Sequence, residues 1–151
     1  MIINGLNEFS QRFADHLFVC FPDLARYARA DEGALVVEVP SPANSKRGLI
    51  VASDDNEISL GFDNWHAHVG DETTSEAQKF ELASQLVDDF LHERVMVAAK
   101  FKDQQFVAAR LLRSEDGLDS EPPGEPGERL FVRSFRGTHD ANYQANETIE
   151  H

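Results

Sequence analysis

The stretch GLIVASDDNEISLGFDNWHAH, residues Gly48 to His68, decides the fold, because it reads as a hairpin followed by a break in phase. Its first apolar run, 49–52, is typical of a strand covered on both faces. In the second run Ile58, Leu60 and Phe62 alternate with polar residues, as in a half-buried strand. The short Asx side chains between the runs bond local backbone and tolerate left-handed dihedral angles. The pattern therefore predicts two antiparallel strands joined by an acidic turn.

The alternation of this hairpin breaks after Phe62. If the strand simply continued, His66 and His68 would fall on its apolar face and Trp65 on its polar face. A bulge or bend near 61–64 restores the phase, and such irregularities redirect side chains at the rims of sheets. We therefore expect the chain to change direction here.

The remaining segments alternate between helix and strand patterns. Apolar residues at three- and four-residue spacing predict an amphipathic helix over 6–21, with Asn4 or Asn7 as its N-cap. The spacing of Thr73 and Glu76 is that of a capping box, which predicts the start of a second long helix. Strand patterns predict further strands over 34–39, 94–101, 106–112 and 130–135.

The order of elements is helix, strand, hairpin, helix, hairpin, strand, and hairpins require antiparallel pairing. We therefore expect an α+β fold: a single domain with a mostly antiparallel sheet of about six strands and two main helices packed largely on one face. The domain is expected to span 1–136 and to carry an acidic Pro/Gly-rich loop at 114–128. Residues 137–151 form a polar C-terminal tail that is expected to fray.

Composition limits the class of protein. Hydrophobic residues make up 41% of the 151-residue chain, which is enough for one domain with its own core. Cys20 is the only cysteine, so an internal disulfide is excluded, and we expect it to pack beside the aromatic stripe of the first helix. The sequence does not open on a basic and apolar leader, and no apolar run is long enough for a bilayer. We therefore expect a cytoplasmic protein.

The charge is the strongest global feature. The formal net charge is −13, and such a surface repels nucleic-acid backbones and anionic membranes, so we expect direct binding to neither. Nine carboxylates lie in 31–72 against two bases, and six lie in 114–128 with none. Asp88 and Asp89 fall near the end of the second helix, where the helix dipole disfavours acids, and we expect both in solvent. The excess of acid indicates either a role in solubility or a partner with a basic face.

Patterns for catalysis and cofactor binding are sparse. His66 and His68 project to the same side of a strand, as a metal pair requires, with Asp63, His92 and Glu93 as candidates to complete a site. Alternatively, the two imidazoles bond Asp63 or line the rim of a sheet. No HExxH pattern, nucleophile elbow, phosphate-cradling loop or dinucleotide fingerprint occurs in the sequence. We therefore expect a non-catalytic protein without a cofactor.

Two segments that lie mainly in 48–94, EISLGFDNWHAHVG and LVDDFLHERV, resemble small bacterial immunity proteins of polymorphic and contact-dependent toxin systems. The resemblance implies a cytoplasmic inhibitor that binds a toxin domain and has no catalysis of its own. The active face of a toxin nuclease must be basic to hold phosphate, so an acidic inhibitor gains association rate and specificity against it.

The surface for such a partner is expected at the acidic turn and the residues that follow it, namely Asp54, Asp55, Glu57, Asp63, Trp65, His66 and His68. A tryptophan flanked by charge is typical of an interface anchor, and it is equally typical of an ordinary core edge. Two other functions remain open. One is a metal-binding enzyme or sensor that uses His66 and His68. The other is a structural or adaptor protein whose acidity serves only solubility.

Overall fold

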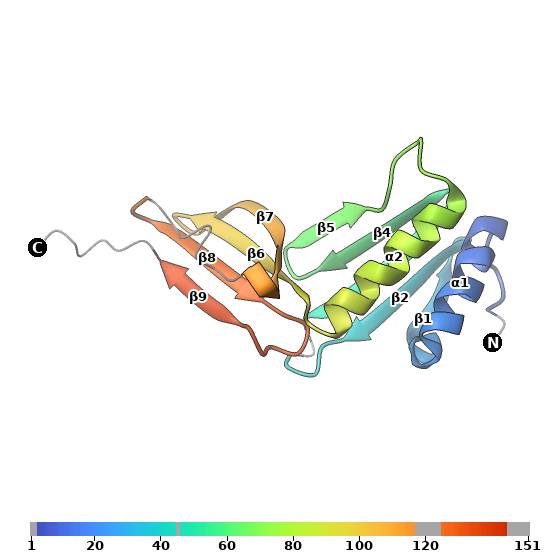
Figure 1. Ribbon diagram of the computed structural model, residues 1–151, viewed down its shortest axis with the longest axis horizontal. Coiled ribbons are helices and arrows are strands. Elements are labelled where there is room, and N and C mark those ends of the chain that lie inside the picture. Colours follow the sequence, from blue (N-terminus) through green and yellow to red (C-terminus); the bar gives the residue numbers. More distant parts are fainter. Residues whose placement is uncertain (1–2, 45, 117–124, 145–151) are drawn as a thin grey trace, which may run out of the picture. The chain divides into compact units, whose positions relative to one another are not determined.

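The computed structural model describes residues 3–44, 46–116 and 125–144 (Figure 1). The chain divides into two compact units: unit 1 is Met1–Phe62 with His66–Asp88, and unit 2 is Asp63–Trp65 with Asp89–His151. The α+β class predicted from the sequence is confirmed, because helices accompany two antiparallel sheets of five and four strands. None of the helices in the described ranges is both long and apolar enough to cross a membrane.

All six predicted strands are present, and the described residues contain three more. The additional strands are β1 (Ala28–Asp31), β5 (Trp65–His68) and β9 (Ala141–Gln144). Each has four residues, which is too short for an alternating pattern to stand out in the sequence. β9 lies within the polar tail predicted from residue 137, so part of that tail is a paired edge strand. The end of the tail, 145–151, lies outside the described residues.

Unit 1 contains a five-stranded meander in the order β1-β2-β3-β4-β5. β2 (Ala34–Pro40), β3 (Gly48–Asp54) and β4 (Glu57–Phe62) are its central strands. Their register places the buried side chains on one face, where they form three rungs: Val37–Val51–Leu60, Val39–Leu49–Phe62 and Leu35–Ser53–Ile58. The hairpin predicted from Gly48 onward is therefore the centre of this sheet.

The predicted bend after Phe62 is a two-residue turn at Asp63 and Asn64. Asp63 has a φ of 55°, a left-handed conformation that an Asx side chain tolerates. The turn returns the chain as β5, beside β4 at the edge of the sheet. The amide of Val69 donates to the carbonyl of Ile58 at 2.8 Å, so this pairing extends past the end of β5.

Two helices cover the buried face of this sheet. α1 (Glu8–Cys20) is capped by Asn7, one of the two predicted caps, whose side chain accepts the Ser10 amide at 2.8 Å. The Ser10 hydroxyl lies 2.8 Å from the Ser53 hydroxyl on β3, a buried contact that fixes α1 on the sheet. Figure 1 shows α1 and α2 (Glu76–Leu91) over the same face of the sheet, as predicted. A 3₁₀ helix, η1 (Pro22–Tyr27), follows α1.

Cys20 contradicts its prediction. It is the last residue of α1 and is exposed, although we expected it to pack beside the aromatic stripe. The stripe itself is buried through Phe9, Phe13 and Leu17, and Phe80 of α2 packs its ring 5.4 Å from that of Phe13. With 3.6 residues per turn Cys20 falls on the same side of the helix as this stripe, so its exposure comes from its place at the last residue of α1.

α2 (Glu76–Leu91) begins two residues later than its predicted capping box allows. The reciprocal bonds are made by Ser75 and Gln78: the Gln78 amide donates to the Ser75 hydroxyl at 3.2 Å, and the Ser75 amide donates to the Gln78 side chain at 3.0 Å. Thr73 instead bonds Asp71 in the preceding turn. The capping-box chemistry was predicted correctly, and its position was wrong.

Unit 2 contains a four-stranded sheet in the order β7-β6-β8-β9. β6 (Val95–Lys102) and β7 (Gln105–Arg113) form the predicted second hairpin, and β8 (Glu128–Arg133) pairs with the other side of β6. One buried cluster on this sheet consists of Met96, Ala98, Leu112, Leu130 and Val132. Of the predicted acidic loop 114–128, a 3₁₀ turn, η2 (Ser114–Asp116), is described, and 117–124 lie outside the described residues.

Asp89 contradicts the expectation of a solvated carboxylate. Its side chain is 5% exposed and accepts Arg94 Nε at 2.9 Å, and Arg113 lies 3.6 Å from its other oxygen. The C-terminal end of a helix carries a partial negative charge, which disfavours an acid there. The two guanidinium groups provide the positive charge that compensates for it, so Asp89 is tolerated at the end of α2.

Glu93 is a second buried carboxylate of unit 2. Its oxygen accepts the backbone amides of Arg136 at 3.0 Å and Thr138 at 3.2 Å. Burial raises the pKa of Glu93, but hydrogen bonds from Ser134, Thr138 and Arg136 outweigh this effect and hold the pKa below its usual value. Glu93 therefore anchors the loop between β8 and β9 as a carboxylate.

Candidate functional site

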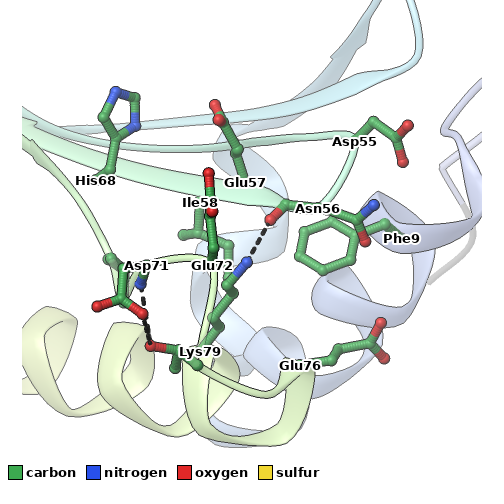
Figure 2. A pocket seen from close by; sticks show the side chains of 13 residues that line it. Phe9, Asp55, Asn56, Glu57, Ile58, His68, Asp71, Glu72, Glu76 and Lys79 are labelled. Carbon is green, nitrogen blue, oxygen red and sulfur yellow. Dashed lines mark hydrogen bonds between the residues drawn. The ribbon is translucent and has the colours of Figure 1, made fainter.

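A pocket of about 610 Å³ lies at one end of the sheet of unit 1. It lies between the β3–β4 turn, the β5–α2 loop and the first turns of the two helices (Figure 2). Phe9 and Ile58 form part of its apolar lining. Five carboxylates also line it, namely Asp55, Glu57, Asp71, Glu72 and Glu76.

Two of these carboxylates are held by neighbours. Glu76 binds Arg12 through two hydrogen bonds of 2.9 Å, which lower the pKa of Glu76 and raise that of Arg12. Asp71 accepts the hydroxyl of Thr73 at 2.6 Å and its amide at 2.8 Å, and these bonds lower the pKa of Asp71. Both groups therefore stay ionised to lower pH than an isolated carboxyl.

The other three carboxylates remain available. Asp55 and Glu57 are exposed on the turn between β3 and β4, and Glu72 is exposed on the opposite loop. No ion pair to any of the three occurs within the ranges that the structure describes. Three uncompensated acids in one concave site produce a negative potential that favours a cation.

Lys79 provides one cation inside this pocket. Its ammonium group donates to the backbone carbonyl of Asn56 at 2.7 Å, and Figure 2 shows the side chain reaching from α2 to the β3–β4 turn. The contact ties the helix to the turn that carries Asp55 and Glu57. It also shows that an ammonium group fits this space, although one lysine does not neutralise five carboxylates.

The structure brings together three of the seven residues predicted for the partner surface: Asp55, Glu57 and His68 all line the pocket. The Nδ1 atom of His68 lies 3.3 Å from the hydroxyl of Ser59 on the neighbouring strand. Figure 2 shows the side chains of His68 and Glu57 extending in the same direction. These three predicted residues therefore lie around the same acidic pocket.

The other four predicted residues do not line the pocket. Asp54 is exposed at the end of β3 and pairs in register with Glu57. His66 is exposed on β5, and its side chain lies on the same side of the strand as that of His68. Asp63 and Trp65 belong to unit 2, where the half-buried Trp65 packs its ring 5.6 Å from that of Phe90. This placement of Trp65 is the core-edge arrangement that the sequence left open.

Sequence reasoning missed Asp71, Glu72 and Lys79. They lie 16 or more residues from Asp55 in the chain, and no spacing motif links them to it. The hairpin turn at 63–64 is the sequence feature that could have identified them. This turn pairs Ile58 with Val69, so the residues before Ile58 lie close to the residues after Val69. Counting outward from that turn would have placed the acids of 71–72 opposite those of 55–57.

The predicted metal pair meets one geometric requirement, since His66 and His68 share a burial phase and both are exposed. Within the part of the chain that the structure describes, no three His, Cys, Asp or Glu side chains lie close enough to hold a metal ion.

No protein-family model, curated protein or solved structure matches this chain. The site must be interpreted from its own geometry.

Proposed function

We propose that this chain is an acidic, non-catalytic binding protein that neutralises a cognate toxin domain by occluding a basic surface, in the manner of bacterial immunity proteins. The observation that carries the proposal is the acidic pocket, in which Asp55, Glu57 and Glu72 lack ion-pair partners within the described residues. A protein that only required solubility has no need to gather its acids around a concave site.

Charge supports a basic partner. Among the described residues, unit 1 carries 14 carboxylates against 6 lysines and arginines, a balance of −8. Such a surface accelerates association with a basic protein through long-range attraction, and it discriminates against acidic competitors. The phosphate-binding face of a nuclease meets this description, as the resemblance to immunity proteins implies.

The pocket supports recognition of individual side chains. A lysine or arginine of the partner would enter between the β3–β4 turn and the β5–α2 loop and meet Asp55, Glu57 and Glu72. Charge-assisted hydrogen bonds of this kind are stronger than neutral ones, and arginine can form two to one carboxylate. The partner is held by these contacts, and its own basic active face is covered.

The test is coexpression with the product of the neighbouring gene, followed by measurement of cell growth and of affinity by calorimetry at several salt concentrations. We expect rescue of growth and an affinity that falls as salt rises. The variant Asp55→Lys with Glu57→Lys should weaken binding by about tenfold or more.

A matched control separates local from global charge. Asp31→Lys with Glu32→Lys makes the same change of charge on an exposed turn of unit 1 that does not line the pocket. It should change affinity much less than the pocket variant. If both variants lost the same affinity, the net charge of the protein and not the pocket would determine binding. Binding that is absent or insensitive to salt would refute the proposed function.

A further inference from the structure

The edge of the sheet in unit 1 lies next to the acidic pocket. β5 is the last strand of the order β1-β2-β3-β4-β5, so one side of it has no strand neighbour in that sheet. Its chain continues through His68 and Val69, which line the pocket. Such an edge presents backbone groups that can pair with another extended chain.

The pairing of β5 with β4 identifies which backbone groups face outward. The Val69 amide donates to the Ile58 carbonyl at 2.8 Å, so residue 69 directs its backbone groups toward β4. Alternate residues of an antiparallel strand face alternate sides. The amides and carbonyls of His66 and His68 therefore face the open edge. The 3.3 Å contact between His68 and Ser59 agrees with this register, because it places residue 68 opposite residue 59.

We propose that β5 accepts an extended, basic segment of the partner protein as an added strand, with cationic side chains of that segment reaching the acidic pocket. This inference rests on the proposed function and specifies how the partner binds. Backbone hydrogen bonds to His66 and His68 supply affinity, and the carboxylates of Asp55, Glu57 and Glu72 supply the selection for positive charge.

Charge distinguishes β5 from the long edge strand of unit 2. β7 carries Arg110 and Arg113, which repel a basic segment, and its pairing with β6 contains an irregularity between Lys100 and Phe101. Bulges of this kind protect edges from added strands. β5 itself contains no lysine, arginine or proline, and acids surround the end of it.

The test uses a short peptide that alternates arginine and valine, because alternation matches the two faces of an added strand. His66→Pro removes the outward amide of residue 66 without removing a bond to β4, since proline is tolerated where the amide faces away from the ladder. His66→Ala is the matched control, because it removes the same imidazole and keeps the amide. Titration calorimetry and amide hydrogen exchange are the readouts.

We expect the peptide to bind the native protein and to slow exchange at the amides of His66 and His68. His66→Pro should weaken binding by about tenfold, the effect of one lost hydrogen bond, and His66→Ala should not. A peptide alternating glutamate and valine should not bind.

Failure of the inference is distinguishable from failure of the proposed function. In one outcome Asp55→Lys with Glu57→Lys weakens peptide binding, the affinities of His66→Pro and His66→Ala are equal, and the peptide slows exchange at neither amide. Strand addition is then overturned, and the acidic pocket retains its role. If neither the pocket variant nor salt affects binding, the proposed function is overturned as well. If the arginine peptide does not bind at low salt, the edge does not accept a basic strand.

Discussion

The two units use acidic residues in opposite ways. Among the described residues of unit 1 the buried polar residues are all serines, Ser10, Ser41, Ser53 and Ser84, and the carboxylates lie at the surface. In unit 2 two carboxylates, Asp89 and Glu93, are buried and hold arginines and backbone amides. By sequence, unit 2 carries 13 carboxylates against 8 lysines and arginines, a balance of −5, whereas unit 1 has a balance of −8.

This difference shows that net charge becomes informative only when the placement of each charge is known. A buried acid needs donors around it, because an isolated charge in the interior is costly, and it therefore fixes local structure. An exposed acid without a partner contributes to the potential around the molecule. Unit 1 accordingly keeps its carboxylates at the surface, whereas Asp89 and Glu93 of unit 2 act as structural anchors.

The largest expected effect concerns the hydrophobic core of unit 1. Phe13 is 0% exposed, and its ring centroid lies 5.4 Å from that of Phe80. Phe13→Ala should lower the free energy of unfolding by about 3–5 kcal/mol, because it removes buried contacts and leaves a cavity. Chemical denaturation monitored by circular dichroism measures the loss.

Phe106→Ala is the matched change in unit 2. Phe106 also packs against an aromatic ring, that of Phe101 at 5.6 Å, but it is 49% exposed. We expect a loss of about 1 kcal/mol. A cost for Phe106→Ala as large as that for Phe13→Ala would contradict the view that this part of unit 2 is open to solvent.

The next effect tests the buried acid of unit 2. Asp89→Ala should destabilise the protein by about 2 kcal/mol, less than the 3–5 kcal/mol typical of fully buried pairs, because Arg94 and Arg113 are half exposed and can be solvated. Glu81→Ala on the exposed face of the same helix is the control, with an expected change below about 0.5 kcal/mol. Similar values for the two variants would remove the distinction between anchored and surface acids.

Glu93 adds a dependence on pH. Its pKa is lower in the folded protein than in the unfolded chain, so its stabilising contribution is complete above about 4.3, the usual pKa of a glutamate. That contribution is lost as the pH falls through the lower folded value. Glu93→Gln should cost about 1–1.5 kcal/mol at neutral pH, because the amide keeps an oxygen but loses the charge.

Denaturation at pH 7 and at about pH 3 checks this prediction. The difference between Glu93→Gln and the native protein should shrink at the lower pH. A constant difference would show that Glu93 acts through its shape and packing, and that its charge is not what anchors the loop at Arg136 and Thr138.

The sequence predicted what depends on local pattern and missed what depends on pairing across the fold. The apolar periods of α1, α2 and six strands were sufficient to place them, and Asn7 was among the expected caps. β1, β5 and β9 are short, and they exist because a neighbouring strand completes their hydrogen bonds. The burial of Asp89 likewise depends on Arg113, which lies 24 residues further along the chain and reaches it only after β6 and β7 have paired.

The same distinction explains which residues of the predicted partner surface lie together in the structure. Asp55, Glu57 and His68 belong to one hairpin, so a pattern within one stretch identified them. Asp71 and Glu72 join them through the register of β4 and β5, which the sequence analysis did not extend beyond the turn. Trp65 was expected at the surface or at a core edge, and only its contact with Phe90 distinguishes between the two.

The smallest expected effect sharpens the comparison at α2, which begins in unit 1 and ends in unit 2. Ser75→Ala removes the hydroxyl that accepts the Gln78 amide, and it should cost about 0.5–1 kcal/mol, the usual value of an N-cap. Thr73→Ala should cost less, because Thr73 bonds Asp71 in the turn and caps no helical amide. Hydrogen exchange should show faster opening of the amides at the start of α2, and no change in β6 and β8 of unit 2. If exchange in β6 accelerated by the same factor, the two units would unfold as one cooperative structure, and the contrast between them would be one of charge and chemistry alone.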